Sequence, residues 1–192
     1  MSQIQKCVFD GLHFVAEECS LEEAIKANTA VGASKEDAVK AIFTVGGVYV
    51  TNLTQETLNI MGGVGVDVSM YQPGPMLVSI REFTEGLTEE EAKALVAHEV
   101  GHLKHDHLHL DIPEVNGVRV SMHEHTELQA DAFAVGLGLG KALISAIEKL
   151  VGNTAYYFGI YTANKHLGDM YHQEVFESVQ YRFAAIRAAI NN

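Results

Sequence analysis

The 192-residue sequence contains no tryptophan, three prolines and two cysteines. So little proline, together with 47% apolar and 20% charged residues, excludes collagen-like and disordered chains and predicts one globular domain spanning residues 1–192. Cys7 and Cys19 are too few for a disulfide framework and form no C-x-x-C pair. We therefore expect two free thiols in a reducing compartment.

Basic residues and long apolar runs are also scarce. The 13 Lys and Arg residues face 25 Asp and Glu residues, and the net charge of −12 repels the phosphates of nucleic acids. The first ten residues lack the apolar core of a secretory signal. The longest apolar run, over residues 132–140, ends at Lys141 and is too short to span a membrane. These absences predict a cytoplasmic protein without a membrane span and without a nucleic-acid partner.

Local patterns predict a mostly helical α+β fold. Capping residues followed by apolar residues at helical spacing predict helices over residues 20–31, 34–45 and 54–61. Alternating valines over 64–68 and an apolar run over 76–80 predict two paired strands and a small antiparallel sheet.

The clearest helix signal begins at Thr88 and extends to about His105. Thr88 and Glu91 form a capping box, three acidic residues occupy the positive end of the helix dipole, and an apolar stripe follows. Further helices are expected toward the C-terminus, over 124–135 and over 141–190 with interruptions near Gly152 and Gly168.

This helix contains an H-E-x-x-H motif formed by His98, Glu99 and His102. Residues four apart on a helix are separated by about 400° of rotation and about 6 Å of rise, so both imidazoles leave the same face and can bind one metal ion. Glu99 lies about 100° round the helix, where it can reach a metal-bound water and act as a general base. Gly101 is unfavourable inside a helix by about 1 kcal/mol, which predicts close contact with another element.

A catalytic zinc site needs a third protein ligand and one open position. The metzincin arrangement is excluded, because positions 105 and 108 hold His and Leu rather than Gly and His. Glu127, 25 residues after His102, is the candidate third ligand on the next expected helix. Asp131 lies one turn further on the same face, where its carboxylate could accept the outer N–H of a ligand imidazole. A solvated helix acid is the alternative interpretation of Glu127.

Two segments, residues 95–105 and 127–131, closely resemble the gluzincin peptidases related to the CAAX prenyl endopeptidase and the HtpX heat-shock protease, whose hallmark is H-E-x-x-H followed by E-x-x-A-D. The resemblance covers about a quarter of the chain. It implies a zincin-like domain that binds one Zn²⁺ per chain. The roles that it implies are His98, His102 and Glu127 as zinc ligands, Glu99 as catalytic base and Asp131 as supporting carboxylate.

Two features depart from that group. Many of its members are integral membrane proteins, whereas this sequence has no spanning segment. The group also tends to carry H-P-S/P-x-x-x-R on a late helix, and residues 176–182 keep Ser178 and Arg182 but lack the His and Pro. His172, Tyr181 and Arg182 are therefore candidates for oxyanion or substrate contacts, with a structural role as the alternative.

The histidines that follow the motif are crowded along the chain: His105, His107, His109, His123 and His125. They predict either a second metal site or a polar loop with surface imidazoles, and we favour the loop. A further hypothesis is that a thiolate of Cys7 or Cys19 caps the zinc ion and keeps an enzyme latent.

The motif predicts a zinc-dependent endopeptidase that acts on a peptide or protein substrate. Such a substrate could pair as an added strand with an edge over residues 76–83. Three alternatives stay open. They are a proteolytically silent or latent zinc-binding relative that acts as a regulatory or interaction protein, a histidine-rich metal buffer, and a peptidase restricted to one substrate.

Overall fold

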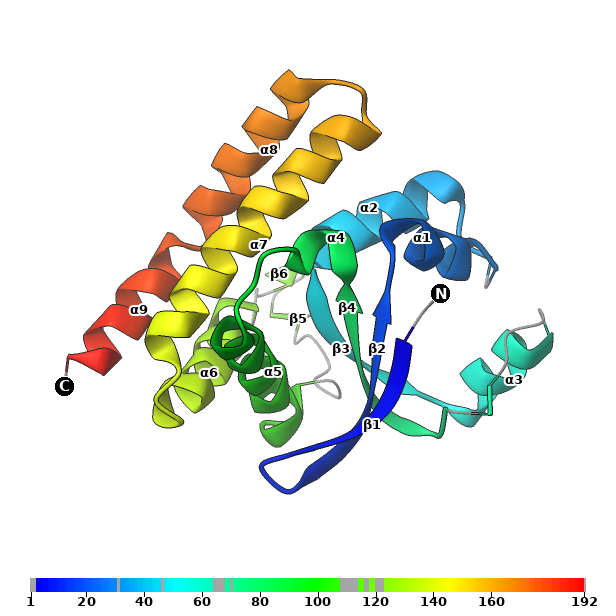
Figure 1. The fold of residues 1–192 in the computed structure, drawn as a ribbon, viewed down its shortest axis with the longest axis horizontal. Helices are drawn as coiled ribbons and strands as arrows, with labels where there is room; N and C mark the ends of the chain where they lie inside the picture. The colour runs from blue at the N-terminus through cyan, green and yellow to red at the C-terminus, as the bar shows by residue number, and fades with distance from the viewer. Residues whose placement is uncertain are drawn as a thin grey trace.

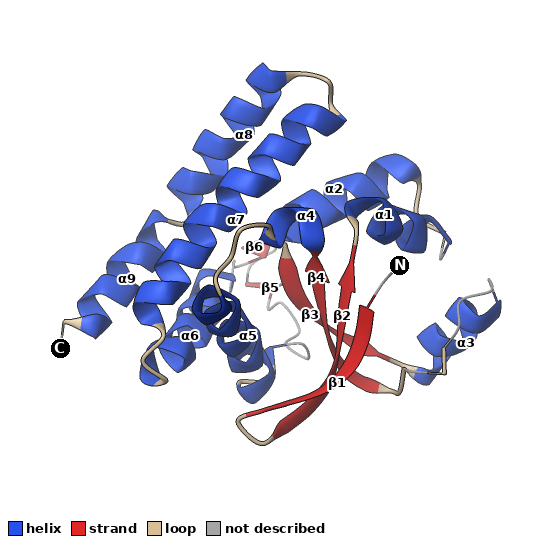
Figure 2. Ribbon diagram, in the orientation of Figure 1, coloured by secondary structure: helices blue, strands red, loops and turns tan. Residues whose placement is uncertain are grey.

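The computed structural model describes residues 3–30, 32–45, 47–63, 68–69, 71–107, 114–115, 118–119 and 123–191. These residues form a mostly helical α+β structure with a small mixed sheet of four strands (Figures 1 and 2). The elements are, in chain order, β1 (Gln3–Phe9), β2 (Leu12–Cys19), α1 (Leu21–Ala30), α2 (Lys35–Val45), β3 (Val48–Leu53), α3 (Gln55–Gly63), β4 (Gly74–Ile80), α4 (Arg81–Thr84), α5 (Glu89–Lys104), β5 (Glu114–Val115), β6 (Val118–Arg119), α6 (His123–Gly136), α7 (Gly140–Tyr161), α8 (Lys165–Ser178) and α9 (Gln180–Ile190).

The four-stranded sheet has the strand order β1-β2-β4-β3. β1 and β2 are antiparallel, and so are β3 and β4, but β2 and β4 are parallel. A parallel pair requires a long crossover connection, and here the chain leaves β2 through α1 and α2 before it returns. The expectation of an antiparallel sheet is therefore wrong for the central pair of strands.

The strand expected over residues 76–80 is confirmed as β4, but its surroundings differ from the expectation. It lies inside the sheet, with β2 on one side and β3 on the other. It therefore presents no edge to a substrate strand, and the expected docking edge over 76–83 is wrong. Of the strand expected at 64–68, residues 64–67 lie outside the described residues, and Val68 belongs to no strand.

The helices expected in the first half of the chain are confirmed as α1, α2 and α3. At the start of α1, the Glu23 N–H donates to the Ser20 hydroxyl at 3.2 Å, and the Ser20 N–H donates to a Glu23 carboxylate oxygen at 2.9 Å. This reciprocal pair satisfies N–H groups that have no partner inside the helix. The capping residues therefore fix where the helix begins.

Two long helices, α7 and α8, pack against each other and project from the rest of the fold (Figure 1). The expected interruptions at Gly152 and Gly168 are wrong, because each helix continues through its glycine. A Cβ at Gly168 would lie 2.8 Å from the carbonyl oxygen of Ala155, so glycine permits the two helices to approach closely. The chain breaks instead after Tyr161 and at Val179. No helix in the described part of the chain is long and apolar enough to cross a membrane.

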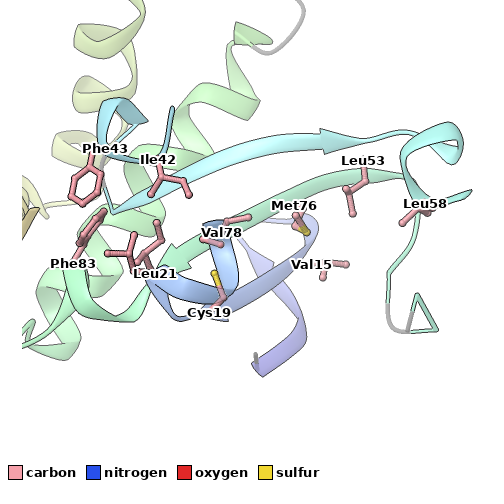
Figure 3. Close-up of a cluster of buried hydrophobic side chains, with 12 residues drawn as sticks. Val15, Cys19, Leu21, Ile42, Phe43, Leu53, Leu58, Met76, Val78 and Phe83 are labelled. Atoms are coloured by element: carbon pink, nitrogen blue, oxygen red, sulfur yellow. The ribbon is translucent and has the colours of Figure 1, made fainter. Parts of the chain in front are cut away.

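The two faces of the sheet pack against different helices, because successive strand residues point in opposite directions. On one face, buried residues of β2 and β4 pack against α1, α2 and α3 (Figure 3). On the other face, Phe14 and Leu77 pack against Val100 of α5. A further cluster joins α5 to the C-terminal helices through Leu95, Leu143 and other buried residues. α5 is therefore held between the sheet and the helical layer, which fixes the orientation of its faces.

Candidate metal centre

α5 is anchored at its N-terminus by the expected capping box. The Glu91 N–H donates to the Thr88 hydroxyl at 3.2 Å, and the Thr88 N–H donates to a Glu91 carboxylate oxygen at 2.7 Å. Glu91 also accepts hydrogen bonds from Lys149 at 2.7 Å and from Ser145 at 2.6 Å, both on α7. These bonds, above all that from Lys149, lower the pKa of Glu91 to about 2. This buried carboxylate ties the start of α5 to α7.

α5 and α6 cross in close contact at Gly101. A Cβ placed there would lie 2.8 Å from the Cα of Ala130 and 3.0 Å from its carbonyl oxygen, both backbone atoms of α6. The residue must therefore be glycine, which confirms the close contact expected from the sequence. Glu127 and Asp131 lie on either side of Ala130 along α6, so the crossing brings both carboxylates toward the motif on α5.

Three side chains from these two helices converge. The Nε2 atoms of His98 and His102 lie 3.1 Å apart. Glu127 places Oε2 at 3.4 Å from the Nε2 of His98 and Oε1 at 3.3 Å from the Nε2 of His102. Together the three residues form a group that could hold a metal ion. The structure thus brings together the residues that the sequence nominates as ligands.

The outer nitrogen of His98 contacts Asp131, at the place expected for a supporting carboxylate. His98 Nδ1 lies 2.8 Å from Asp131 Oδ1, and both side chains are buried. Burial alone would lower the pKa of the imidazole, but hydrogen bonds to Asp131 and Glu127 outweigh this effect and raise the pKa of His98 to about 9. Burial would likewise raise the pKa of Asp131, but hydrogen bonds from Arg182 and His98 hold it below its ordinary value.

Arg182 on α9 links the two carboxylates of α6. Its Nη2 and Nε donate to the two oxygens of Asp131 at 2.6 and 2.8 Å, and its Nη1 lies 2.7 Å from Glu127 Oε2. The two parallel bonds to Asp131 form the bidentate arrangement in which arginine binds carboxylates most specifically. Burial tends to raise the pKa of Glu127, but its contacts with the imidazoles of His102 and His98 and the charge of Arg182 hold it well below its ordinary value.

The sequence also nominates His172 and Tyr181. His172 lies on α8, where its ring stacks on Phe176 with centroids 5.7 Å apart. It lines a groove between α7 and α8 together with Tyr156, so it lies in a different environment from Arg182. Tyr181 precedes Arg182 on α9 and is half-buried. Of the three residues nominated for oxyanion or substrate contacts, Arg182 contacts Glu127 of the ligand cluster directly.

Glu99 follows His98 on α5 and is only 7% exposed. Burial raises the pKa of Glu99 above its ordinary value, and the nearby imidazoles of His98 and His102 oppose part of that rise. Its carboxylate is not part of the ligand group. The site therefore contains a buried carboxylate of elevated proton affinity next to the first ligand.

Two residues at the cluster were not expected there: His107, which the sequence analysis places in a surface loop, and Gln129. The Nδ1 atoms of His102 and His107 lie 2.9 Å apart, and His107 Nε2 lies 3.0 Å from the side-chain oxygen of Gln129. The expectation of a surface imidazole is wrong for His107, which is half-buried and packs edge-on against the His102 ring. The available signal is its position three residues after the end of α5, because a chain that turns there can fold back on the last turn of the helix. Nothing in the pattern marks Gln129.

The remaining histidines do not extend the cluster in the described part of the chain. His105 stacks on His107, and His125 is exposed. His109 and the side chain of His123 lie outside the described residues. Among the residues that are described, the cluster above is the one group that could hold a metal ion.

Both cysteines are free thiols, as expected. Cys19 is buried in the cluster on the sheet (Figure 3), where burial raises the pKa of its thiol to about 12. Burial also raises the pKa of Cys7, which is half-buried on β1. Both environments oppose formation of the thiolate, which argues against either cysteine as a cap on a metal ion.

No family model, curated protein or solved structure matches this chain. The likeness to gluzincin peptidases stays a prediction from residues 95–105 and 127–131. The functional interpretation therefore depends on the geometry of α5, α6 and α9.

Proposed function

We propose that the protein is a zinc-dependent endopeptidase of the gluzincin type, with His98, His102 and Glu127 as zinc ligands. The main support is the separation of the donor atoms. The Nε2 atoms of His98 and His102 lie 3.1 Å apart, and they lie 3.4 and 3.3 Å from the Glu127 oxygens. In a tetrahedral zinc site with metal–ligand distances of about 2.0–2.1 Å, neighbouring ligand atoms lie about 3.3–3.4 Å apart. The donor separations match the edges of such a site.

The chemistry of the donors favours zinc over hard cations. Two imidazoles and one carboxylate form a ligand set of catalytic zinc sites, whereas Ca²⁺ and Mg²⁺ bind oxygen ligands. When bound, zinc would lower the pKa of a coordinated water to about 7 and polarise the substrate carbonyl. The contact between His98 and Asp131 supports the same interpretation, because carboxylates commonly orient ligand imidazoles.

Glu99 is the proposed general base. It lies next to His98 but outside the ligand group, so it would accept a proton from the attacking water and return it to the leaving amine. Its burial and raised pKa suit a group that holds a proton between these two steps.

Arg182 is proposed to hold the carboxylates of Glu127 and Asp131 rather than the oxyanion. Its Nε, Nη1 and Nη2 atoms all contact carboxylate oxygens of Asp131 or Glu127 at 2.6–2.8 Å. A guanidinium bound in this way neutralises the charges of the buried Asp131 and the half-buried Glu127 and fixes the positions of both side chains. The substrate oxyanion would then depend on zinc and on groups outside this set.

Metal content and peptide cleavage, measured on the same samples, test the proposal. We expect one zinc ion per chain in the wild type and cleavage of a quenched-fluorescent peptide library that a chelator abolishes. Glu127→Ala should lose the zinc. Glu99→Gln should keep the zinc and lose at least about 10²-fold in cleavage rate. Glu148→Ala, which removes an exposed acid from α7, is the matched control and should behave as the wild type.

Folded wild-type protein without zinc would contradict the proposal, and so would full cleavage by Glu99→Gln. One zinc ion without cleavage at any pH would favour the proteolytically silent or latent relative. More than one zinc ion per chain would favour the metal buffer.

A further inference from the structure

His107 is placed between a proposed zinc ligand and α6. It lies three residues after Lys104, the last residue of α5, and its ring meets His102 at a centroid distance of 5.0 Å and an interplanar angle of 70°. One ring nitrogen faces His102 Nδ1 at 2.9 Å, and the other faces the Gln129 oxygen at 3.0 Å. His107 thus bridges the end of α5 to α6 on the side of His102 away from Glu127.

Together with a metal ion on the Nε2 of His102, these contacts determine which ring nitrogens carry protons. A His102 that binds metal through Nε2 must be neutral with its proton on Nδ1. That Nδ1–H points at His107 Nδ1, which must then accept and leave the His107 proton on Nε2. The His107 Nε2–H in turn needs an acceptor, and the side-chain oxygen of Gln129 is in place. Every donor in the chain meets an acceptor, and every member is neutral.

The orientation of the Gln129 amide decides the outcome. If its NH₂ group faced His107, then His107 would carry its proton on Nδ1, opposite the Nδ1–H of His102. His102 would have to move its proton to Nε2, the atom needed for the metal. The two ligand histidines are thus oriented by different means: His98 by the charged Asp131, and His102 by a neutral pair.

We propose that His107 and Gln129 form a neutral hydrogen-bonded relay that holds His102 in the Nδ1–H tautomer and so prepares its Nε2 for metal. His107 and Gln129 are positioning residues in this role. The inference rests on the proposed metal centre at His98, His102 and Glu127. The tautomer can also be measured without metal, where the His102 Nε2 faces the His98 Nε2 at 3.1 Å and Glu127 Oε1 at 3.3 Å.

Zinc affinity, measured by competition with a chelating dye, is the first test. His107→Phe keeps a ring to pack against His102 and His105 but removes both nitrogens, and Gln129→Met keeps the length of the side chain but removes the acceptor. Each should weaken zinc binding by about 10–100-fold, the usual cost of losing an outer partner of a ligand. His107→Asn and Gln129→Glu restore an acceptor oxygen and should recover most of the affinity. His166→Phe, at an exposed position on α8, is the control and should match the wild type.

The second test needs no metal. In metal-free protein at pH 8, ¹⁵N chemical shifts of the histidine rings should show His102 with its proton on Nδ1, and this population should fall in His107→Phe. Circular dichroism should show that both variants stay folded. Wild-type affinity in His107→Phe, or a metal-free His102 with its proton on Nε2, would overturn the relay. A wild type that binds no zinc but shows the Nδ1–H tautomer would overturn the proposed metal centre and leave the relay supported.

Discussion

Gly101 is the contact point between the two helices that carry the proposed ligands. A methyl group there would meet the Cα of Ala130 at 2.8 Å. Backbone atoms of a packed helix cannot move aside as the end of a flexible side chain can, so the two helices would have to separate. Gly152 is the opposite case, because it lies inside α7 and a Cβ placed there meets nothing within 4 Å.

The same substitution should therefore have opposite effects at these two glycines. Gly101→Ala should lower the free energy of unfolding by about 1–3 kcal/mol through overpacking. Gly152→Ala should raise it by about 0.5–1 kcal/mol, since alanine is the better helix former. Urea denaturation followed by circular dichroism measures both changes. A Gly101→Ala variant as stable as the wild type would show that the crossing is looser than described.

At the scale of elements, the stability of α5 depends on the carboxylate of Glu91 in its first turn. Glu91 accepts hydrogen bonds from the Thr88 backbone and from Ser145 and Lys149 of α7. The folded protein lowers its pKa from the ordinary value of 4.5 to about 2, so folding favours the ionised form. Its contribution to stability is complete above about pH 4.5 and is lost as the pH falls toward 2.

We predict that Glu91→Gln is less stable than the wild type by about 1–3 kcal/mol at neutral pH, the usual loss for hydrogen bonds to a charged group. The difference should shrink as the pH falls from 4.5 toward 2, because the wild-type carboxylate then becomes protonated. Thermal denaturation of both proteins across this range measures it. Glu90→Gln, an exposed position in the same turn, is the control. A difference that stays constant with pH would contradict this account of the cap.

Local signals predict the helices of this protein better than its strands. Capping residues such as Ser20 and Thr88 bind partners three residues away, so the residue pattern alone locates α1 and α5. The sequence analysis predicted no strand before residue 64 and so missed the β1–β2 hairpin, although Asp10 and Gly11 are a local signal for it: they form a turn pair with φ of 47° and 76°. β3 has no such local signal, because it forms by pairing with β4, a strand that follows α3.

At the scale of the whole molecule, the arrangement of elements decides which residues meet. His98, His102 and Glu127 could be predicted from the sequence because each motif lies within one helix: H-E-x-x-H in α5 and E-x-x-A-D in α6. The position of Arg182 beside Asp131, 51 residues earlier, exists only because α9 packs on α6. No local pattern specifies that contact, just as none specifies that β4 lies between β2 and β3.

Zinc should stabilise the whole fold if the proposed centre is correct. A ligand that binds only the folded state adds about 2.7 kcal/mol when its free concentration is 100 times Kd. For a chain of this size we expect a rise of roughly 5–10 °C in the midpoint of thermal unfolding. Calorimetry with zinc and with a chelator measures the shift, and Glu127→Ala should show none. Equal midpoints for the wild type in both conditions would argue against a site between α5 and α6.

α6 supplies the proposed third ligand and, within the same five residues, two of the residues proposed to orient the ligand histidines: Glu127, Gln129 and Asp131. If α6 were displaced by one residue along α5, all three side chains would move away from the motif together. The close contact at Gly101 fixes the distance between the two helices. We therefore expect the three ligands to come together in one step during folding, when α6 docks on α5.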